Sequence, residues 1–408
     1  MHTGRTLQQC TLHVDLGAID QNCAEIRKHI GSSCGFCAVV KADGYGLGAL
    51  RVGSRLSAHA DCLAVYSPDE AGELLAAGIT TPILILAPMY SIDRFHPVYR
   101  GLSVGNVHLV LHGKEHVMAI SQLAKRFGFS ISVHLKIDTG LHRGGCDESD
   151  ASEIIEMIQL DRRLKLKGVM THFASAVHDV NLTKLQHDRL DNILDSLQNP
   201  LPASCLIHEA NTAAMIQWDW SHRNMVRVGL AWTGIVPAGV PVLSGFKSVV
   251  SWRTSLVHVR KVRGGEQVGY SGSWTAKRDS IIGVVPVGYA AGYPMQVGEE
   301  GDKQGAFVRI FDEVFSIPLG DAPVIGCVCM DQIAIDLTDL QPVGIGCGVE
   351  LLSSDSTSKA SLSHIAHVAG VVPHAIISRI SPNVPRSYKS AIPMIVTGDG
   401  AAVQSKCV

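Results

Sequence analysis

Eight short apolar runs alternate with helix-like segments between about residues 34 and 235, and this alternation constrains the fold most. The runs cover residues 34–41, 62–67, 82–88, 104–111, 131–138, 166–173, 204–210 and 225–232. Their continuous apolar character is typical of parallel strands that are buried on both faces. Eight strand–helix alternations predict an α/β fold with a (β/α)8 barrel of the TIM type.

The segments between the runs carry helix signals. Ser67 is a capping residue, Pro68 suits the first helical position, and Gly78 is a typical stop. A second helix is predicted over residues 181–197, where apolar residues recur at helical spacing.

The pattern changes after about residue 245. Short strand-like runs follow at 249–262, 266–272, 281–289, 305–311, 313–319 and 327–337. Glycine, aspartate and charged turns separate them, which is typical of a mostly antiparallel β domain. We therefore predict a barrel over residues 1–245, a β domain over 246–390 and a loose tail over 391–408.

Composition excludes several classes of protein. The chain has 408 residues, which favours two domains over a single core. Its formal net charge of -2 gives no reason to expect nucleic acid or a membrane surface as a partner. We see no secretory leader and no apolar run near the roughly 20 residues that span a bilayer, so we expect a cytoplasmic protein.

The eleven cysteines are scattered, and Cys34 and Cys37 form a lone CxxC. Without a second pair at metal spacing, we expect buried thiols in a reducing compartment and no metal.

Polar residues follow the ends of several predicted barrel strands. Chemistry in such barrels sits at the carboxyl ends of the strands, so these side chains should share one mouth. The residues are Lys41, Lys136, Asp138, Arg143, His172, Asn211, Thr212 and Arg227.

Lys41 is the most informative of these residues because a lysine that closes an apolar strand is costly unless it is exposed, paired or used. A desolvated lysine loses its proton more easily and becomes a nucleophile for a carbonyl group. The alternative is a lysine whose charged end simply reaches solvent.

The chain resembles the alanine racemase family. The motifs that carry the resemblance, in family order, are AVVKADGYGLGA, KIDTGLHRGG, THFA, EANTAA, RVGLAWTG, GYSGSWTA, PVGYAAGYP, VCMDQ and NVPRSY, between about residues 11 and 390. The resemblance implies a pyridoxal 5'-phosphate (PLP) enzyme with a barrel and a β domain. It also implies a head-to-tail homodimer with shared active sites and a role in supplying D-alanine for peptidoglycan.

The resemblance implies a role for each matching residue. Lys41 would hold the cofactor and act as the base on one face of the substrate, and Tyr270 of the partner subunit would act on the other face. His172 would lie beneath the cofactor ring, and Arg227 would face its pyridine nitrogen. An arginine keeps its charge, so that nitrogen would stay unprotonated and transamination would be limited.

The remaining matches concern the two anionic groups. Tyr45, Thr212, Gly229 and Leu230 match the phosphate positions. Arg143, with backbone support near Met330, matches the contact to the substrate carboxylate. Lys136 matches a lysine that is carbamylated in many members, although it could instead be an ordinary partner of Asp138.

Two departures from the family pattern leave the substrate range open. Ala291 stands where aspartate is usual, and Pro382 stands where alanine-specific members have a tyrosine. Proline there resembles broad-spectrum racemases, so a serine or broader racemase is the alternative to an alanine racemase. A non-catalytic PLP carrier would lack the β domain and Tyr270. A PLP decarboxylase would usually have glutamate in place of Arg227.

Overall fold

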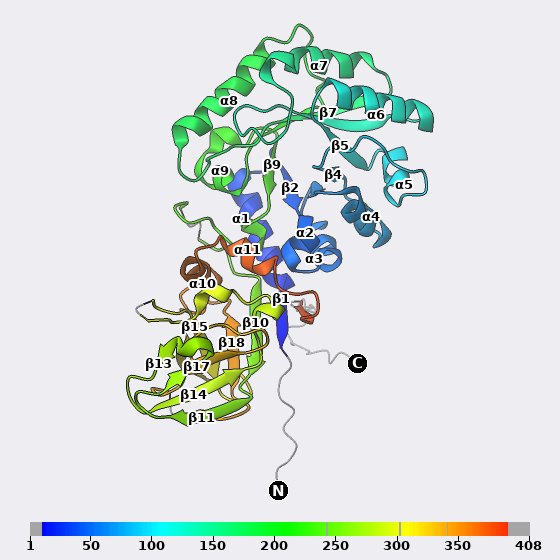
Figure 1. The fold of residues 1–408 in the computed structure, drawn as a ribbon. Helices are drawn as coiled ribbons and strands as arrows, with labels where there is room; N and C mark the ends of the chain where they lie inside the picture. Colours follow the sequence, from blue (N-terminus) through cyan, green and yellow to red (C-terminus); the bar gives the residue numbers. More distant parts are fainter. Residues whose placement is uncertain (1–9, 242–243, 302, 341, 391–408) are drawn as a thin grey trace, which may run out of the picture.

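The chain folds into an eight-stranded parallel barrel and a nine-stranded, mostly antiparallel sheet, which lie one above the other in Figure 1. The computed structural model describes residues 10–241, 244–301, 303–340 and 342–390. The predicted tail at 391–408 lies outside the described residues.

The barrel strands coincide with the eight apolar runs. They are β2 (Gly35–Val39), β3 (Cys62–Val65), β4 (Ile83–Ile85), β5 (Val107–Leu111), β6 (Ile131–Lys136), β7 (Leu164–Met170), β8 (Leu206–His208) and β9 (Met225–Val228). Neighbours pair in parallel in the order β8-β7-β6-β5-β4-β3-β2-β9. Between β8 and β9, the Asn224 amide donates to the Ile207 carbonyl at 3.1 Å, which brings the ends of the sheet together. The predicted TIM-type barrel is confirmed.

Nine helical segments belong to the barrel among the described residues, of which α2 is a left-handed turn and not a regular α-helix. They are α1 (Leu16–Ile30), α2 (Lys41–Gly46), α3 (Ala49–Leu56), α4 (Pro68–Ala76), α5 (Val98–Ser103), α6 (Lys114–Phe127), α7 (Glu148–Leu160), α8 (Val180–Asp195) and α9 (Thr212–Gln217). Helix α4 begins as predicted: Ser67 Oγ accepts from the Glu70 amide at 3.2 Å, and the Glu70 carboxylate accepts from the Ser67 amide at 3.1 Å. The helix predicted over 181–197 is α8.

The second part of the molecule is built on the nine-stranded sheet. Its strands are β10 (Val250–Ser255), β11 (His258–Val262), β14 (Ser280–Val285), β15 (Phe307–Phe311), β16 (Pro318–Ile325), β17 (Ile333–Asp336), β18 (Gly348–Leu352) and β19 (Arg386–Lys389), together with β1 (Thr11–Asp15). The short strands β12 (Gln267–Val268) and β13 (Trp274–Thr275) pair separately, and α10 (Leu362–Ala369) and α11 (Pro373–Ile377) complete this part.

Strand β1 differs from the predicted division of the chain, which counted residues 11–15 with the barrel. It pairs antiparallel with β10 and parallel with β19, so it lies inside the nine-stranded sheet. Helix α1 follows it directly, with Asp15 as the cap whose carboxylate accepts from the Ala18 amide. The short run TLHVD therefore begins the second sheet before the chain enters the barrel.

One predicted strand is wrong. Most of the run 313–319 is a turn, in which the Asp312 carboxylate accepts hydrogen bonds from the amides of Ser316 and Ile317. Phe315 has a left-handed φ of 56° within this turn. Strand β16 begins only at Pro318 and continues through a segment that the apolar pattern did not predict.

The turn that follows β2 forms hydrogen bonds with the second domain. The Arg386 guanidinium donates to the Gly46 carbonyl at 3.1 Å, and the Tyr388 hydroxyl donates to the Leu47 carbonyl at 3.0 Å. Residues from β19 therefore hold the chain immediately after Lys41 in place. No helix in the described part of the chain is long and apolar enough to cross a membrane.

Candidate active site

Lys41 lies at the carboxyl end of β2 and begins an unusual left-handed turn. Residues 42–45 all have positive φ angles, between 53° and 62°, although only Gly44 tolerates this region freely. The turn is held from outside, because the Glu70 carboxylate accepts from the Ala42 amide at 2.6 Å and Asp43 accepts from the Ala49 amide at 2.7 Å. These contacts keep the residue after Lys41 in a conformation that it would not adopt by itself.

The environment of Lys41 makes loss of its proton easier than for a lysine in water. Burial lowers the pKa of Lys41 below its ordinary value, the nearby charge of Arg143 lowers it further, and Glu70 partly opposes both. Lys41 is half-buried, and this partial loss of solvent is the main cause of the lowered pKa. The neutral amine is the nucleophilic form.

Arg227, on β9, is buried, and its two terminal guanidinium nitrogens donate hydrogen bonds within the protein. Nη1 donates to the His208 carbonyl and to His208 Nδ1, at 2.7 and 2.9 Å. Nη2 donates to the carbonyls of Thr171 and Glu209, and reaches His172 Nδ1 at 3.2 Å. Nε is the guanidinium nitrogen for which the described residues show no acceptor. Burial lowers the pKa of Arg227 to about 10, which still leaves it charged at neutral pH.

His172, after β7, lies among the cations of the barrel mouth. Burial holds its pKa well below the ordinary value, and the charges of Arg227, Arg143, Lys136 and Lys41 act in the same direction. The imidazole is therefore neutral, and its Nδ1 is free to accept from Arg227.

Arg143 is presented by a loop that one carboxylate organises. Asp138 accepts backbone hydrogen bonds from Gly140, Leu141, His142 and Arg143, at 2.9–3.2 Å. Burial alone would raise the pKa of Asp138, but these amides outweigh it and hold the pKa below its ordinary value. The Asp138 carboxylate thus fixes the conformation of the loop that follows β6.

Lys136, at the end of β6, has a lowered pKa because of burial and the charges of Arg143 and Arg227, which Asp138 partly opposes. It lies among cations and forms no ion pair with Asp138 in the described structure. The amine is consequently biased toward its neutral form.

Donors for an anionic group converge between α9, β9 and the Lys41 turn. Thr212 Oγ1 lies 3.2 Å from the Leu230 amide. Tyr45 packs edge-on against Trp232, and its hydroxyl occupies the space that a Cβ at Gly229 would fill. Two hydroxyls beside a glycine suit a phosphate, and the Leu230 amide, which donates to Thr212 Oγ1, lies next to them. The cations of the mouth suit an anionic cofactor and substrate, so the residues present fit PLP.

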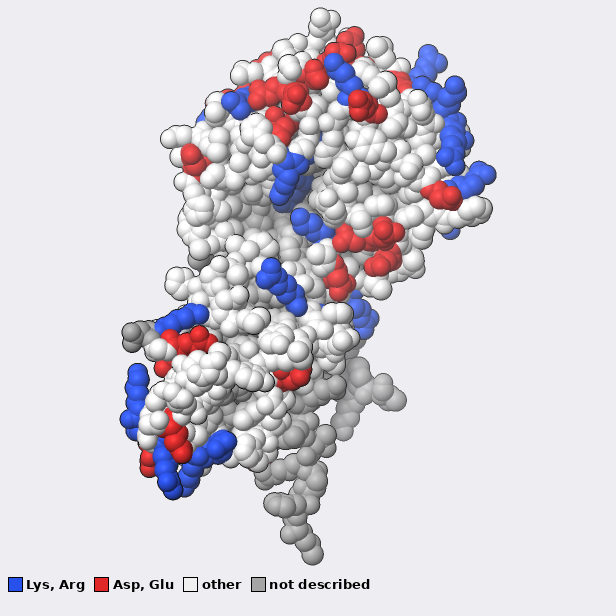
Figure 2. Space-filling model, viewed as in Figure 1, with Lys and Arg blue, Asp and Glu red and all other residues white. Residues whose placement is uncertain are grey.

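The positive side chains are visible on the surface. Figure 2 shows Lys and Arg side chains in the hollow between the barrel and the second domain, with acidic side chains along its edge. Such a field attracts small anions.

The structure does not bring all predicted site residues together. Tyr270 and Met330 line a separate pocket with Gly269, Cys329, Asp331 and Gln332, all from the second domain. Tyr270 is 72% exposed and Met330 is 54% exposed. Among the described residues neither contacts the Lys41 cluster, so a single chain leaves these two side chains open to solvent.

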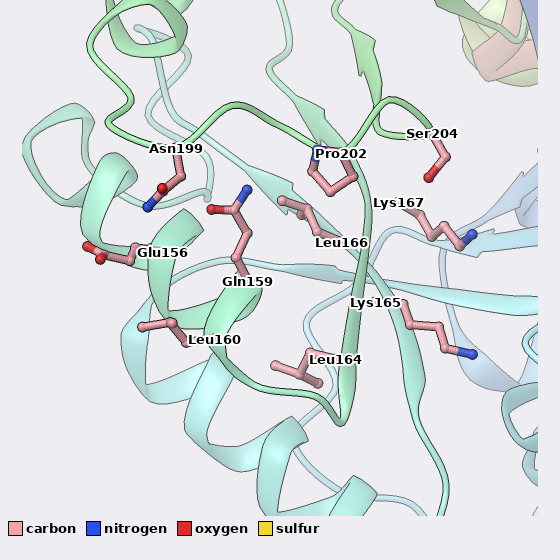
Figure 3. Close-up of a pocket in the computed structure, with 10 residues that line it drawn as sticks. All are labelled: Glu156, Gln159, Leu160, Leu164, Lys165, Leu166, Lys167, Asn199, Pro202 and Ser204. Atoms are coloured by element: carbon pink, nitrogen blue, oxygen red, sulfur yellow. The ribbon is translucent and has the colours of Figure 1, made fainter.

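The opposite end of the barrel also carries a hollow, at the start of β7 (Figure 3). Lys165 and Lys167 extend away from Glu156 and Gln159, which lie on α7. The polar groups there do not converge, in contrast to those around Lys41.

Sequence reasoning missed Glu70 and His208 as parts of the site. In the sequence, Glu70 stands out only as an acidic residue near the start of the helix that Ser67 caps, whereas its carboxylate also supports the Lys41 turn. His208 was read as one residue of an apolar strand. The available signal was the histidine itself, because an imidazole in a buried strand is costly unless it has a hydrogen-bond partner.

A barrel followed by an antiparallel β domain, with a desolvated lysine at the mouth and phosphate-type donors opposite, defines a two-domain barrel enzyme. Comparison with known families agrees. Residues 14–237 match the N-terminal domain of alanine racemase, and residues 249–388 match its C-terminal domain.

Individual relatives match over nearly the whole chain. Alanine racemase 1 of Caldanaerobacter subterraneus subsp. tengcongensis is 34% identical over 92% of this chain and 94% of its own length. The crystal structure of alanine racemase from D-cycloserine producing Streptomyces lavendulae superposes with a TM-score of 0.82 at 25% identity, over 95% of this chain and 99% of that one.

Alanine racemase from Bartonella henselae, solved with covalently bound pyridoxal phosphate, shares the fold at a TM-score of 0.78 and 22% identity, over 93% of this chain and 99% of that one. The chain belongs to the alanine racemase family, which confirms the resemblance seen in its motifs.

Proposed function

We propose that this protein is a PLP-dependent racemase that interconverts L- and D-alanine by two-base proton transfer. The observation that carries the proposal is Lys41, a desolvated lysine with a lowered pKa at the mouth of the barrel. PLP, when bound, supplies an electron sink that stabilises the carbanion left by removal of the α-proton. The family of the chain supports this reaction.

In this proposal, each residue of the site has a separate role in the reaction. Lys41 binds the cofactor covalently and moves the α-proton on one face of the substrate. Tyr270 of the partner subunit moves the proton on the other face, which fits its exposure in a single chain. A homodimer with shared sites follows. Arg227 would face the pyridine nitrogen of the cofactor with its Nε donor, and His172 would lie beneath the cofactor ring.

The anionic groups are held separately. Tyr45, Thr212, Gly229 and Leu230 would bind the phosphate. Arg143, with backbone support near Met330 of the partner subunit, would bind the substrate carboxylate.

Lys136 would be carbamylated: its neutral amine adds to CO2 and loses a proton, and the resulting anion orients Arg143. The lowered pKa of Lys136 supports this step.

The alternative is a racemase of broader range. Its support is the pair of departures, which adjoin in space: the Ser381 amide, next to Pro382, donates to the Ala291 carbonyl at 3.0 Å. The role in D-alanine supply for peptidoglycan and the cytoplasmic location belong to this proposal too.

The test combines a spectrum with an assay. The purified protein with added PLP should absorb in the visible range and convert L-alanine into a racemic mixture, which chiral chromatography detects. Lys41→Ala should abolish both, whereas Lys165→Ala, on the exposed opposite end of the barrel, should change neither. An unchanged visible spectrum in Lys41→Ala would show that another lysine holds the cofactor.

A further inference from the structure

Three histidines, His108, His134 and His208, form a row of hydrogen-bonded rings through the interior of the barrel, which we call the histidine file. His108 Nδ1 lies 3.0 Å from His134 Nε2, and His134 Nδ1 lies 2.9 Å from His208 Nε2. His208 Nδ1 in turn lies 2.9 Å from Arg227 Nη1. The file therefore connects β5, β6 and β8 to the arginine on β9.

The barrel makes room for this file. His134 and His208 are on β6 and β8, and the strand between them is β7. On β7, Gly168 faces the gap, and a Cβ added there would overlap the His134 ring. His134 and His208 are 1% and 0% exposed, so neither imidazole is solvated by bulk water. A glycine at this one position lets two buried rings meet across a strand.

Arg227 fixes the proton positions along the file. A guanidinium only donates, so His208 Nδ1 must accept and His208 Nε2 must carry the proton. That proton is donated to His134 Nδ1, and the same logic makes His134 Nε2 donate to His108 Nδ1. Burial holds the pKa of both inner histidines well below the ordinary value, which keeps them neutral and able to accept.

The far end of the file reaches an opening. His108 and His134 line a hollow with Ser33, Cys34 and Asn224, which lie at the amino ends of the barrel strands. Burial lowers the pKa of His108 to about 4, with Lys167 acting in the same direction. The file thus runs from the amino-terminal opening of the barrel to the guanidinium beneath its mouth.

We propose that His108, His134 and His208 are positioning residues for Arg227. Each ring orients the next, and the last acceptor holds Nη1, so that Nη2 stays on His172 and Nε faces the barrel mouth. The inference rests on the proposed function, because the Nε donor matters to a bound PLP ring.

The file has a direct energetic consequence. A hydrogen bond to a charged group stabilises the folded protein more than a bond between neutral groups does. A buried donor that is left without an acceptor destabilises the folded protein. Removing the His134 ring therefore leaves the buried N–H of His208 Nε2 unpaired, and the ring that accepts from Arg227 loses the contact that orients it.

The test compares two replacements of the same ring. His134→Leu removes the acceptor of the His208 proton, while His134→Asn keeps an acceptor oxygen near the position of Nδ1. For His134→Leu we expect kcat for alanine to fall at least about tenfold with KM within about twofold, as loss of a transition-state interaction predicts. The visible absorption band of the bound cofactor should also shift. His134→Asn should recover most of kcat and the wild-type band.

A matched control separates positioning from general stability. His222 is also buried and reaches the Met215 carbonyl at 2.7 Å, but it lies outside the file. His222→Leu should lower the melting temperature and leave the band and kcat unchanged. If it instead reproduced the His134→Leu effects, the file would have no special role and the proposal would be overturned.

Two further outcomes overturn the inference. One is a folded His134→Leu protein with the wild-type band and kcat, and the other is a His134→Asn protein as impaired as His134→Leu. If His134→Leu does not fold, His108→Leu and His108→Asn at the more open end make the same comparison. A wild-type protein without visible absorption or racemase activity would instead refute the proposed function.

Discussion

The hydroxyl group of Tyr45 occupies the space that the side chain of any residue other than glycine would need at position 229. Tyr45 lies in the left-handed turn after β2, and Gly229 directly follows β9, so the contact joins the ends of two strands that pair with each other. Both residues belong to the proposed phosphate site.

Gly229→Ala should weaken cofactor binding. The added methyl group must displace the Tyr45 ring, and such overpacking costs about 1–3 kcal/mol. If this cost falls on the bound state, we expect the Kd for PLP to rise by a factor between about 5 and about 100, since 1.4 kcal/mol corresponds to a factor of ten. Titration of the apoprotein with PLP measures this. Gly344→Ala, where a Cβ meets no atom within 4 Å, is the matched control and should bind normally.

Inactive subunits should restore activity when they are mixed. Lys41→Ala and Tyr270→Phe disable different halves of a shared site, so each heterodimer contains one site with both wild-type residues. Random reassociation should give about a quarter of the wild-type activity, because half of the dimers are mixed and each has one intact site of two. Heterodimers that form but remain inactive would contradict sharing.

Stability should fall in mild acid. Burial lowers the pKa of His108 and His112 to about 4, and holds that of His134, His172 and His208 well below the ordinary 6.5. Below about pH 6.5 the unfolded chain binds protons that the folded protein does not, so the free energy of unfolding decreases toward pH 4.

Urea unfolding at a series of pH values measures this slope. His108→Asn removes one such group and should flatten the slope by about 1 kcal/mol per pH unit. An identical slope in this variant would show that His108 does not contribute.

Pro382 should widen the range of substrates. Pro382 is exposed, and two aromatic side chains of the second domain, Tyr388 and Trp274, are held by other contacts and do not replace the missing tyrosine. Tyr388 donates to the Leu47 carbonyl, and Trp274 donates to Glu299 at 3.2 Å. We expect measurable racemisation of serine beside alanine.

Pro382→Tyr should shift the ratio of kcat/KM for alanine to kcat/KM for serine in favour of alanine. The expected shift corresponds to about 1–3 kcal/mol, which is what one small group contributes to discrimination. A wild-type protein that ignores serine, together with an unchanged ratio in the variant, would remove Pro382 from the specificity determinants.

Sequence patterns predicted the barrel because its strands are buried on both faces and so appear as unbroken apolar runs. The second sheet was harder. The β16 segment contains Gly320 and Asp321 and follows a turn that itself contains Val314 and Phe315, so hydrophobicity pointed to the wrong residues. The motifs pointed to Lys41 and Arg227, and the charges of both act on His172 in the structure.

The histidine file lay beyond such reasoning. His108, His134 and His208 are 26 and 74 residues apart and look alike in sequence. Only the parallel register of the strands, with Gly168 between two of them, brings the rings together.

The place of β1 in the second sheet affects the order in which the protein can be built. On the ribosome, residues 11–15 are made first, yet their partners β10 and β19 come about 240 and 375 residues later. The barrel strands are all synthesised in that interval, so the barrel can close while the first strand still waits for its neighbours. The second sheet, and with it the contacts of β19 with the turn after Lys41, can be completed only after residues 386–389 have been made.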